Sequence, residues 1–386
     1  MVSAVLFITF FVLLVLNVPI SVCLGLSSAA AILYSGTSLT IVATNIYSGI
    51  SKFLLLAIPF FVLSGNIMAK AGISTRLIRF VDTCVGHRKG GIANVCIIVA
   101  CFFGAISGSG PATVAALGAV LIPAMVERGG FSAAFSTALM ATSSSIAIVI
   151  PPSIAFVVYA SITGVSIGDM FMAGIIPGIL MGLALVVVVM LEVRRNHVVP
   201  SNVEKASAKE RWNAFKDAFW GFLMPVIILG GIYGGIFTPT EAAAVSVVYG
   251  LFVGMIIYKE VKFKDLWEIL IDSAKTTGGI MLIVACASLF SFVCTRFGIS
   301  TAASELLARV AGNQFTFLLI CNIIFLIAGC FIDANSAMYI FIPIMLPVCK
   351  ALGYNVIAFG IMATVNLAIG QVTPPVGVNL FVAIGI

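Results

Sequence analysis

Two short polar stretches interrupt long apolar segments and carry the residues most able to bind an ion. SGSGP occupies 107–111 in the middle of the apolar segment 92–125, and DANS occupies 333–336 in the middle of 315–348. Each segment is too long for a single membrane span. A helix that breaks at mid-membrane and turns back has this pattern, and its free backbone groups need protein, water or ions as partners. We expect two re-entrant hairpins; two full spans joined by a tight turn are the alternative.

Each expected hairpin is followed by an apolar segment with a Pro-Pro pair. TSSS at 142–145 precedes PPS at 151–153, and GQVTPP occupies 370–375. Proline lacks an N–H and pushes the preceding residue out of the helical region, so carbonyls before each pair are freed. Freed carbonyls beside Ser, Thr and Asn form an oxygen cage that suits Na⁺, and nearby helix N-termini favour an anionic substrate group. The alternative is that the prolines only kink a span, with Ser and Thr capping the break.

Three further polar residues lie in or near apolar segments. Asp333 is a carboxylate deep in an apolar run, where ionised groups are usually functional. It can balance a cation or take up a proton; the alternative is a helix N-cap. Glu241 is the other candidate carboxylate; the alternative, which we favour, is that Thr240 is an N-cap and Glu241 a first-turn acid. Asn66 is expected to make an interhelical hydrogen bond.

The residues that most catalysis requires are missing. The two histidines, His87 and His197, lie in polar stretches, and no phosphate-binding Gly-rich loop or Cys-x-x-Cys pair occurs. Ser107 and Ser109 do not match a nucleophile elbow. We therefore expect a protein that is not an enzyme and has no cofactor.

Composition places the chain in a membrane. Of its 386 residues 61% are hydrophobic and only 9% are charged, against about 25% charged in soluble domains. Mean hydropathy is +1.22 and formal net charge is +6. No basic block suggests nucleic acid as a partner, whereas membrane lipid is an obligatory one. The long, uniformly apolar runs favour helices over a β-barrel, so we expect an all-α polytopic membrane protein. The apolar N-terminus has no signal-peptide features and is expected to be retained.

The chain contains an internal repeat with sorted charges. Several matches recur in the same order at nearly constant spacing: GIST at 72–75 and 298–301, MAT at 140–142 and 362–364, and Pro-Pro at 151–152 and 374–375. The link before the first hairpin, 70–91, is rich in Lys and Arg, whereas its counterpart, 296–313, is not. Basic residues mark the cytoplasmic side. The repeats are therefore expected to be inverted, as in many secondary transporters.

The repeat predicts a division of the chain into four parts. They are N-terminal scaffold spans at 1–52; a first repeat at 53–169 with hairpin 92–125 and broken span 131–162; scaffold spans at 170–275 with a cytoplasmic loop at 194–216; and an inverted second repeat at 276–386 with hairpin 315–348 and broken span 356–386. Whether 2–34 forms one broken span or two short ones is left open.

Four motifs together resemble the large membrane subunit of tripartite ATP-independent periplasmic (TRAP) transporters. They are SGSGPAT at 107–113, IPPS at 150–153, FTPTEAA at 237–243 and VTPP at 372–375. The resemblance covers nearly the whole chain. It implies an elevator-type transporter of the bacterial inner membrane that couples uptake of an organic acid to Na⁺. One departure is that the chain ends at Ile386 in an apolar run, where family members usually continue.

The resemblance also implies partners and site residues. The partners are a small four-helix membrane subunit, a periplasmic substrate-binding protein and a small organic anion of the C4-dicarboxylate or sialic acid class. One Na⁺ site would comprise Ser107, Gly108, Thr113, Ser145 and Pro151. The other would comprise Asp333, Asn335, Ser336, Gly370, Thr373 and Pro374. Substrate would lie between them, near Ser107, Ser109, Thr113, Ser144, Asn335, Thr373 and Asn379.

Two other readings of the same residues stay open. Coupling to H⁺ would use Asp333 as the proton carrier. Alternatively, the polar hairpin tips can line the path of an ion channel.

Overall fold

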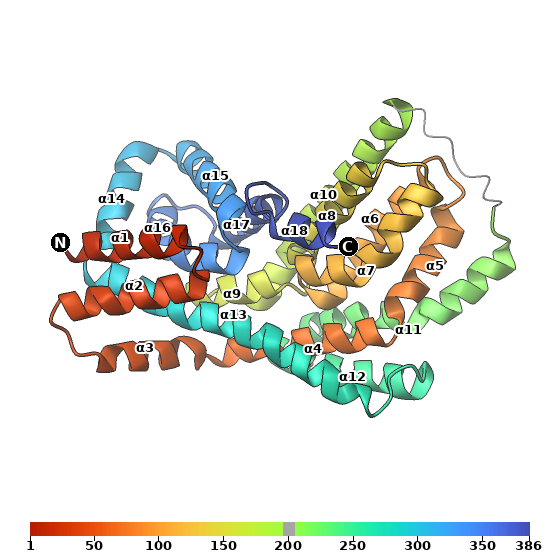
Figure 1. Cartoon of the computed structure of the whole chain (residues 1–386), viewed down its shortest axis with the longest axis horizontal. Helices are drawn as coiled ribbons and strands as arrows, with labels where there is room; N and C mark the ends of the chain where they lie inside the picture. The colour runs from red at the N-terminus through yellow and green to blue at the C-terminus, as the bar shows by residue number, and fades with distance from the viewer. Residues whose placement is uncertain (196–204) are drawn as a thin grey trace.

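The computed structural model describes residues 1–195 and 205–386, and within these ranges the chain forms helices and no strand (Figure 1). Eight helical segments in this part of the chain are long and apolar enough to cross a membrane. They are Phe53–Lys70, Gly110–Glu127, Ile167–Arg195, Ala208–Tyr233, Pro239–Ile257, Asp265–Arg296, Gln314–Phe331 and Ala334–Ala351. The expectation of an all-α polytopic membrane protein is therefore confirmed.

One set of helices packs on the longest helix, α13, or on the neighbours of that helix, and is called the scaffold group below. Its members are α1 (Val2–Val15), α2 (Ile20–Tyr34), α3 (Thr40–Ile50), η1 (Phe53–Leu56), α4 (Ala57–Lys70), α11 (Ala208–Tyr233), α12 (Pro239–Leu251), the π-helix η3 (Phe252–Ile257) and α13 (Asp265–Arg296). At 1.5 Å per residue α13 is about 48 Å long, enough to run past α2, α3 and α4 in turn. Helix α12 packs on α4 and α11.

The N-terminal stretch folds back on itself as two short helices. Helix α1 ends at Val15, Asn17 takes a positive φ of 59°, and Pro19 is the N-cap of α2. The two helices pack against each other. The question that the sequence left open at 2–34 is thereby answered in favour of two helices.

Apart from the short 3-10 helix η2, which only the first contains, the two repeats contain matching helices in the same order. The first contains α5 (Ile73–Val85), α6 (Gly91–Ser107), α7 (Gly110–Glu127), α8 (Ala133–Ser145), η2 (Ile146–Ile148) and α9 (Ile154–Thr163). The second contains α14 (Ile299–Ala311), α15 (Gln314–Phe331), α16 (Ala334–Ala351), α17 (Val356–Gly370) and α18 (Val378–Ile384). In Figure 1 the pair α6–α7 lies toward the right end of the molecule and α15–α16 toward the left.

Small residues make the closest contacts inside each repeat, at matching positions. A Cβ added to Gly104 of α6 would lie 2.8 Å from the Ala147 Cα, after α8. A Cβ added to Gly329 of α15 would lie 2.9 Å from the Gly370 Cα, at the end of α17. Small residues let membrane helices approach this closely. In both repeats the first helix of the hairpin is therefore pressed against the helix that precedes the Pro-Pro break.

Helix α10 (Ile167–Arg195) packs mainly on helices of the two repeats. It was expected to belong to the scaffold part 170–275, but it packs on α6, α9 and α17. The reason is a stripe of glycines four residues apart: Gly174 contacts Phe156, Gly178 contacts Ile150, and Gly182 faces Cys101. We call α6–α10 and α15–α18 the hairpin group.

The predicted cytoplasmic loop 194–216 is shorter than expected. Helix α10 continues to Arg195, and α11 already begins at Ala208. Ser207 and Glu210 form a capping box, in which each side chain binds the backbone N–H of the other residue, so the polar residues 208–216 start a helix. Residues 196–204 of the predicted loop, with His197, lie outside the described residues.

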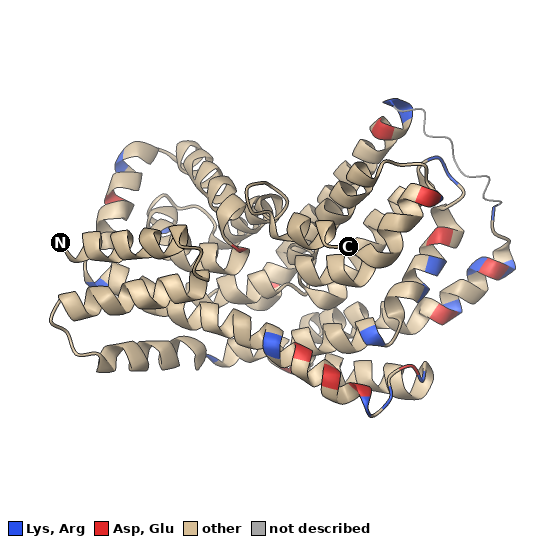
Figure 2. Ribbon diagram, viewed as in Figure 1, with Lys and Arg blue, Asp and Glu red and all other residues tan. Residues whose placement is uncertain are grey.

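Charged residues gather toward the two ends of the molecule (Figure 2). Most lie toward the right end, on α5, the end of α10 and the starts of α11 and α13, and fewer lie on α14 at the left. The helices between carry few charges. Because cytoplasmic loops of membrane proteins are enriched in Lys and Arg, we expect the right end to be the cytoplasmic one.

Candidate functional site

The first hairpin tip is a closed polar turn. Gly108 follows α6 with a φ of +61°, a conformation that favours glycine. Ser107 Oγ lies 2.9 Å from Thr113 Oγ1, which donates to the Ser109 carbonyl at 2.8 Å. A Cβ at Gly108 would lie 2.7 Å from the Pro152 carbonyl oxygen. The tip therefore rests directly on the first Pro-Pro break.

The first break is held by a serine that follows the prolines. The Pro151–Pro152 bond is cis. Ser153 Oγ donates to the Ile148 carbonyl at 2.5 Å and accepts from the Phe156 N–H, which makes it the N-cap of α9. One freed carbonyl of the break is thus satisfied by a side chain.

Two hydroxyls before this break, those of Ser144 and Ser145, also have partners, and one of these partners links the repeats. Ser145 Oγ donates to the Thr142 carbonyl and Ser144 Oγ to the Ala141 carbonyl. Asn379 Nδ2, from α18 of the second repeat, donates to Ser144 Oγ at 3.1 Å and to the Ala141 carbonyl at 3.3 Å. Asn379 therefore ties the two broken spans together.

The second hairpin tip is organised by Asp333. Its Oδ1 accepts from the Asn335 and Ser336 N–H groups at 3.0 and 3.2 Å, and its Oδ2 accepts from the Ser336 hydroxyl. This is the N-cap that the sequence offered as the alternative to an ion ligand. A carboxylate has about four lone-pair sites and three are used, so capping does not prevent cation binding.

The second break is more open than the first. The Pro374–Pro375 bond is cis and Pro374 is exposed. Thr373 Oγ1 donates to the Ile369 carbonyl in the preceding turn. The Val376 N–H donates to the Cys330 carbonyl, which joins the break to the second hairpin.

Both hairpin tips line one partly open cavity of about 250 Å³. Its walls come from the two tips, the two breaks and the scaffold helix α13: Gly108, Ser109, Gly110, Pro111, Ile148, Ile154, Ala155, Thr276, Ile280, Ile283, Asp333, Ala334, Asn335, Gln371 and Val378. A turn between two full spans would lie at a membrane surface instead. The shared cavity therefore favours re-entrant hairpins over the alternative.

The cavity can attract an anion without a cationic side chain. Helices α7 and α9 begin at its wall, at Gly110 and Ile154, whereas the N-terminus of α16 is already occupied by the Asp333 carboxylate. Free N–H groups and the helix dipole make such N-termini partly positive. The lining residues, all within the described ranges, include no Lys, Arg or His, and Asp333 is their one carboxylate.

The same region holds amide oxygens without a partner. The Asn335 Oδ1, Gln371 Oε1 and Asn379 Oδ1 atoms are buried and accept no hydrogen bond. Gln371 and Asn379 are almost fully buried, at 7% and 0% exposure. A buried acceptor without a partner is costly, by about 1–3 kcal/mol. Neutral oxygens of this kind fit a hard cation such as Na⁺.

The residues predicted from the resemblance divide into two sets. Gly108, Ser109, Asp333 and Asn335 line the shared cavity, and Ser107 lines a smaller hollow of about 70 Å³ beside it. The other predicted residues do not line the shared cavity: Thr113, Ser144, Ser145, Pro151, Ser336, Gly370, Thr373, Pro374 and Asn379.

Sequence reasoning missed two polar residues of the cavity wall. Gln371 lies between Gly370 and the Pro-Pro pair, and a glutamine inside an apolar segment was the available signal. Thr276 comes from α13. It lies at the edge of an apolar run, and no sequence motif around it indicated a role in the site.

Two other expectations have clear outcomes. Asn66 Nδ2 donates to Ser273 Oγ of α13 at 2.8 Å, the interhelical hydrogen bond that was expected. The N-cap of α12 is Thr238, however, and not Thr240. Thr238 and Glu241 form a capping box, with Pro239 rather than Thr240 as the first helical residue, so the predicted cap was wrong by two positions.

Comparison with known proteins identifies the family. The family model described as "Tripartite ATP-independent periplasmic transporter, DctM component" matches residues 7–386. A C4-dicarboxylate TRAP transporter large permease protein of Rhodobacter capsulatus is 40% identical, over 97% of this chain and 88% of the relative. The sialic acid TRAP transporter large permease protein of Vibrio cholerae is 36% identical, over 92% and 82%. An isethionate TRAP transporter permease protein of Oleidesulfovibrio alaskensis is 41% identical, over 99% and 60%. The chain belongs to the DctM family of TRAP transporter large permease subunits, multi-pass proteins of the bacterial inner membrane.

Proposed function

We propose that this permease subunit takes up a small organic anion of the C4-dicarboxylate or sialic acid class by Na⁺ symport. A periplasmic binding protein delivers the anion, and a small four-helix membrane subunit completes the membrane complex. The relatives are named for C4-dicarboxylate, sialic acid and isethionate, all of which are organic anions. The anion and the ions share the cavity between the hairpin tips and cross the membrane in an elevator cycle, in which the hairpin group moves against the scaffold group.

The observation that carries this proposal is the pairing of opposite features at one cavity. The N-termini of α7 and α9 favour an anion there, while Asp333 and unpaired amide oxygens favour a cation. Neither ion then enters a dry cavity without a partner, which lowers the cost of moving both. Such a site links anion uptake to cation uptake.

Uptake by the complete system tests the proposal. The permease and its small subunit are reconstituted in vesicles, with the binding protein and labelled substrate outside. We expect accumulation under an inward Na⁺ gradient and none with choline in place of Na⁺. Equal uptake in choline with a pH gradient would assign coupling to H⁺. Single-channel currents in the absence of the binding protein would identify a channel instead.

A further inference from the structure

Helix α5 lies between the scaffold group and the first hairpin. It follows α4, packs on α11 of the scaffold group on one side, and packs on α6 on the other. Its counterpart α14 occupies the same place in the second repeat, between α13 and α15. In an elevator cycle each of these two helices moves either with the scaffold group or with the hairpin group.

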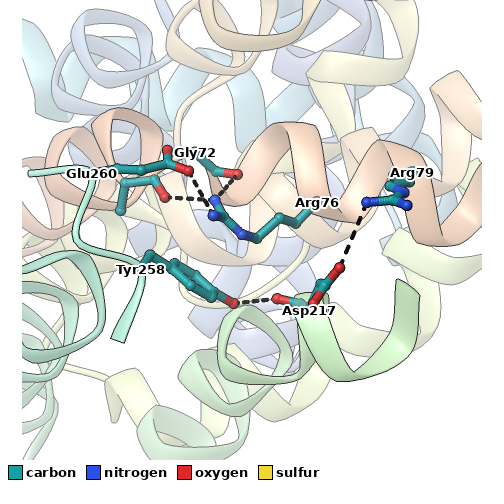
Figure 3. Close-up of polar contacts among 7 residues, drawn as sticks. Gly72, Arg76, Arg79, Asp217, Tyr258 and Glu260 are labelled. Carbon is teal, nitrogen blue, oxygen red and sulfur yellow. Dashed lines mark hydrogen bonds and ion pairs between the residues drawn. The ribbon is translucent and has the colours of Figure 1, made fainter. Parts of the chain in front are cut away.

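Arg76 of α5 is held by residues that directly follow the scaffold helices α4 and η3 (Figure 3). Its Nη2 lies 2.6 Å from Glu260 Oε1, and its Nη1 donates to the carbonyls of Ala71 and Gly72 at 3.2 and 3.0 Å. The guanidinium also lies over the Tyr258 ring, 3.9 Å from its centre. Because a planar guanidinium can bond at its edge and stack on its face, these contacts fix its position together.

The partners of Arg76 are carried by an unusual turn after α12. The helix ends in the π-helix η3, and Lys259 then takes a positive φ of 56°. Both features are uncommon and are often associated with functional sites. They place Tyr258 and Glu260 on either side of Arg76, and a Cβ at Gly72 would collide with the Glu260 carboxylate.

The same turn also binds α11. The Tyr258 hydroxyl donates to the Asp217 carbonyl, and Arg79 lies 3.7 Å from the Asp217 carboxylate. Burial raises the pKa of the Tyr258 phenol to about 12, so it remains a donor at neutral pH. We call Gly72, Arg76, Asp217, Tyr258 and Glu260 the arm clamp.

Helix α14 has no comparable clamp. In the described parts of the chain no ion pair joins α14 to another helix. A Cβ at Gly298, the counterpart of Gly72, would meet no atom within 4 Å. Instead, Ser304 Oγ donates to the Ile344 carbonyl of α16 at 2.6 Å, which joins α14 to the second hairpin.

The chain leaves the clamped region just after α5. Residues 86–89 follow α5, and Gly90 then contacts Val189 and Val193 of α10, in the hairpin group. One ion pair spans these residues, between Asp82 of α5 and Arg128 at the end of α7, at 2.9 Å. Residues 86–89 are therefore the first place where the chain can bend on the cytoplasmic side.

We propose that the arm clamp keeps α5 in the scaffold group throughout transport, whereas α14 travels with the second hairpin. The cytoplasmic hinge then follows α5, at 86–89. The outer hinge precedes α14, at 297–298. The two repeats thus differ in which side of the hinge carries the connecting helix. This inference rests on the elevator cycle proposed above.

Reversible cross-linking of cysteine pairs tests the assignment of both helices. The reagent is a short bis-methanethiosulfonate, which dithiothreitol removes, and the Cys84→Ala background avoids the half-exposed thiol on α5. Arg79→Cys with Asp217→Cys links α5 to the scaffold group. Asp82→Cys with Arg128→Cys links α5 to the first hairpin. Ser304→Cys with Ile344→Cys links α14 to the second hairpin. Each single-cysteine variant, treated in the same way, is the matched control.

We expect uptake to persist in the 79–217 and 304–344 pairs and to be lost in the 82–128 pair until dithiothreitol is added. Loss of uptake on linking 79–217 would mean that α5 moves against α11, and would overturn the clamp. Loss on linking 304–344 would overturn the assignment of α14. Full uptake in the linked 82–128 pair would mean that α5 can travel with the first hairpin and would also overturn the clamp, while Na⁺-dependent uptake itself would still stand.

Discussion

At the scale of single residues, the cavity depends on very few charges. Asp333 is the one carboxylate among its described lining residues, and it already caps α16 through both oxygens. Most of the cation's ligands must therefore be neutral oxygens, such as those of Asn335 and Gln371. Removing the Asp333 carboxylate therefore distinguishes its two possible roles, cation ligand and helix N-cap.

Replacing Asp333 with Asn tests those roles. Asn is as good an N-cap as Asp, so Asp333→Asn should fold normally. Without the negative charge, the Na⁺ concentration for half-maximal uptake should rise about tenfold or more, equivalent to about 1.4 kcal/mol. Uptake measured against Na⁺ concentration checks this.

The matched control for this change is Ser336→Ala. It removes the hydroxyl that binds Asp333 but keeps the charge, so its effect on Na⁺ dependence should be smaller. An unchanged Na⁺ dependence in Asp333→Asn would assign the carboxylate to capping alone.

At the scale of elements, interruptions of helices position the site. The hairpin tips and the Pro-Pro breaks all end helices inside the molecule, where each freed backbone group needs a partner. Ser153 and Asp333 supply caps at two of these ends. The capping box of α12 obeys the same rule away from the cavity, so Thr238 and Glu241 are structural rather than ion-binding residues.

Loss of this capping box should change stability and leave transport intact. Thr238→Ala should lower the free energy of unfolding by about 0.5–2 kcal/mol, the usual cost of losing an N-cap. Glu241→Ala should add little to Thr238→Ala, because both residues belong to one box.

Denaturant unfolding in detergent measures the stability of these variants, and uptake per folded molecule measures their function. If the losses in unfolding free energy caused by the two substitutions were fully additive, this would argue against a shared capping box. A fall in uptake per folded molecule with Glu241→Ala would restore the functional reading of this residue.

At the scale of the whole molecule, the two hairpins lie toward opposite ends (Figure 1), and more ion pairs link the helices at the end that we expect to be cytoplasmic. The cytoplasmic end holds ion pairs that link several helices, including Arg76–Glu260, Asp82–Arg128 and Lys70–Glu268. The outer end has fewer charges, on α14. Helix α10 joins the hairpin group through its glycine stripe, so this group contains more of the chain than the two repeats alone.

Labelling from one side of the membrane tests this orientation. Arg309→Cys on α14 should react with an impermeant maleimide in right-side-out vesicles, because α14 lies at the outer surface. Lys264→Cys, before α13, should react only after permeabilisation. The unsubstituted chain is the control, since its cysteines are buried or half-buried. Reaction of both variants from the same side would contradict the inverted arrangement.

The sequence by itself determined the class of the molecule and the places where its helices break. The small number of charged residues predicted a membrane protein. Glycine, proline and Asp333 predicted interruptions of the apolar runs at 107–111, at 333–336 and at the Pro-Pro pairs. These predictions succeeded because backbone conformation at such residues is decided locally, by a missing N–H, a missing Cβ or a capping oxygen. The repeat also followed from local matches.

Only the tertiary structure decided which of these residues meet. It placed Gly108, Asp333 and Gln371 on one cavity, and left Thr373 and Pro374 outside it. It also assigned α10 to the hairpin group and clamped α5 but not α14. Such choices depend on contacts between segments far apart in the chain, where close approach is set by the facing side chain, such as Phe156 against Gly174. No local pattern contains that partner, so this part of the site could not be predicted from the sequence.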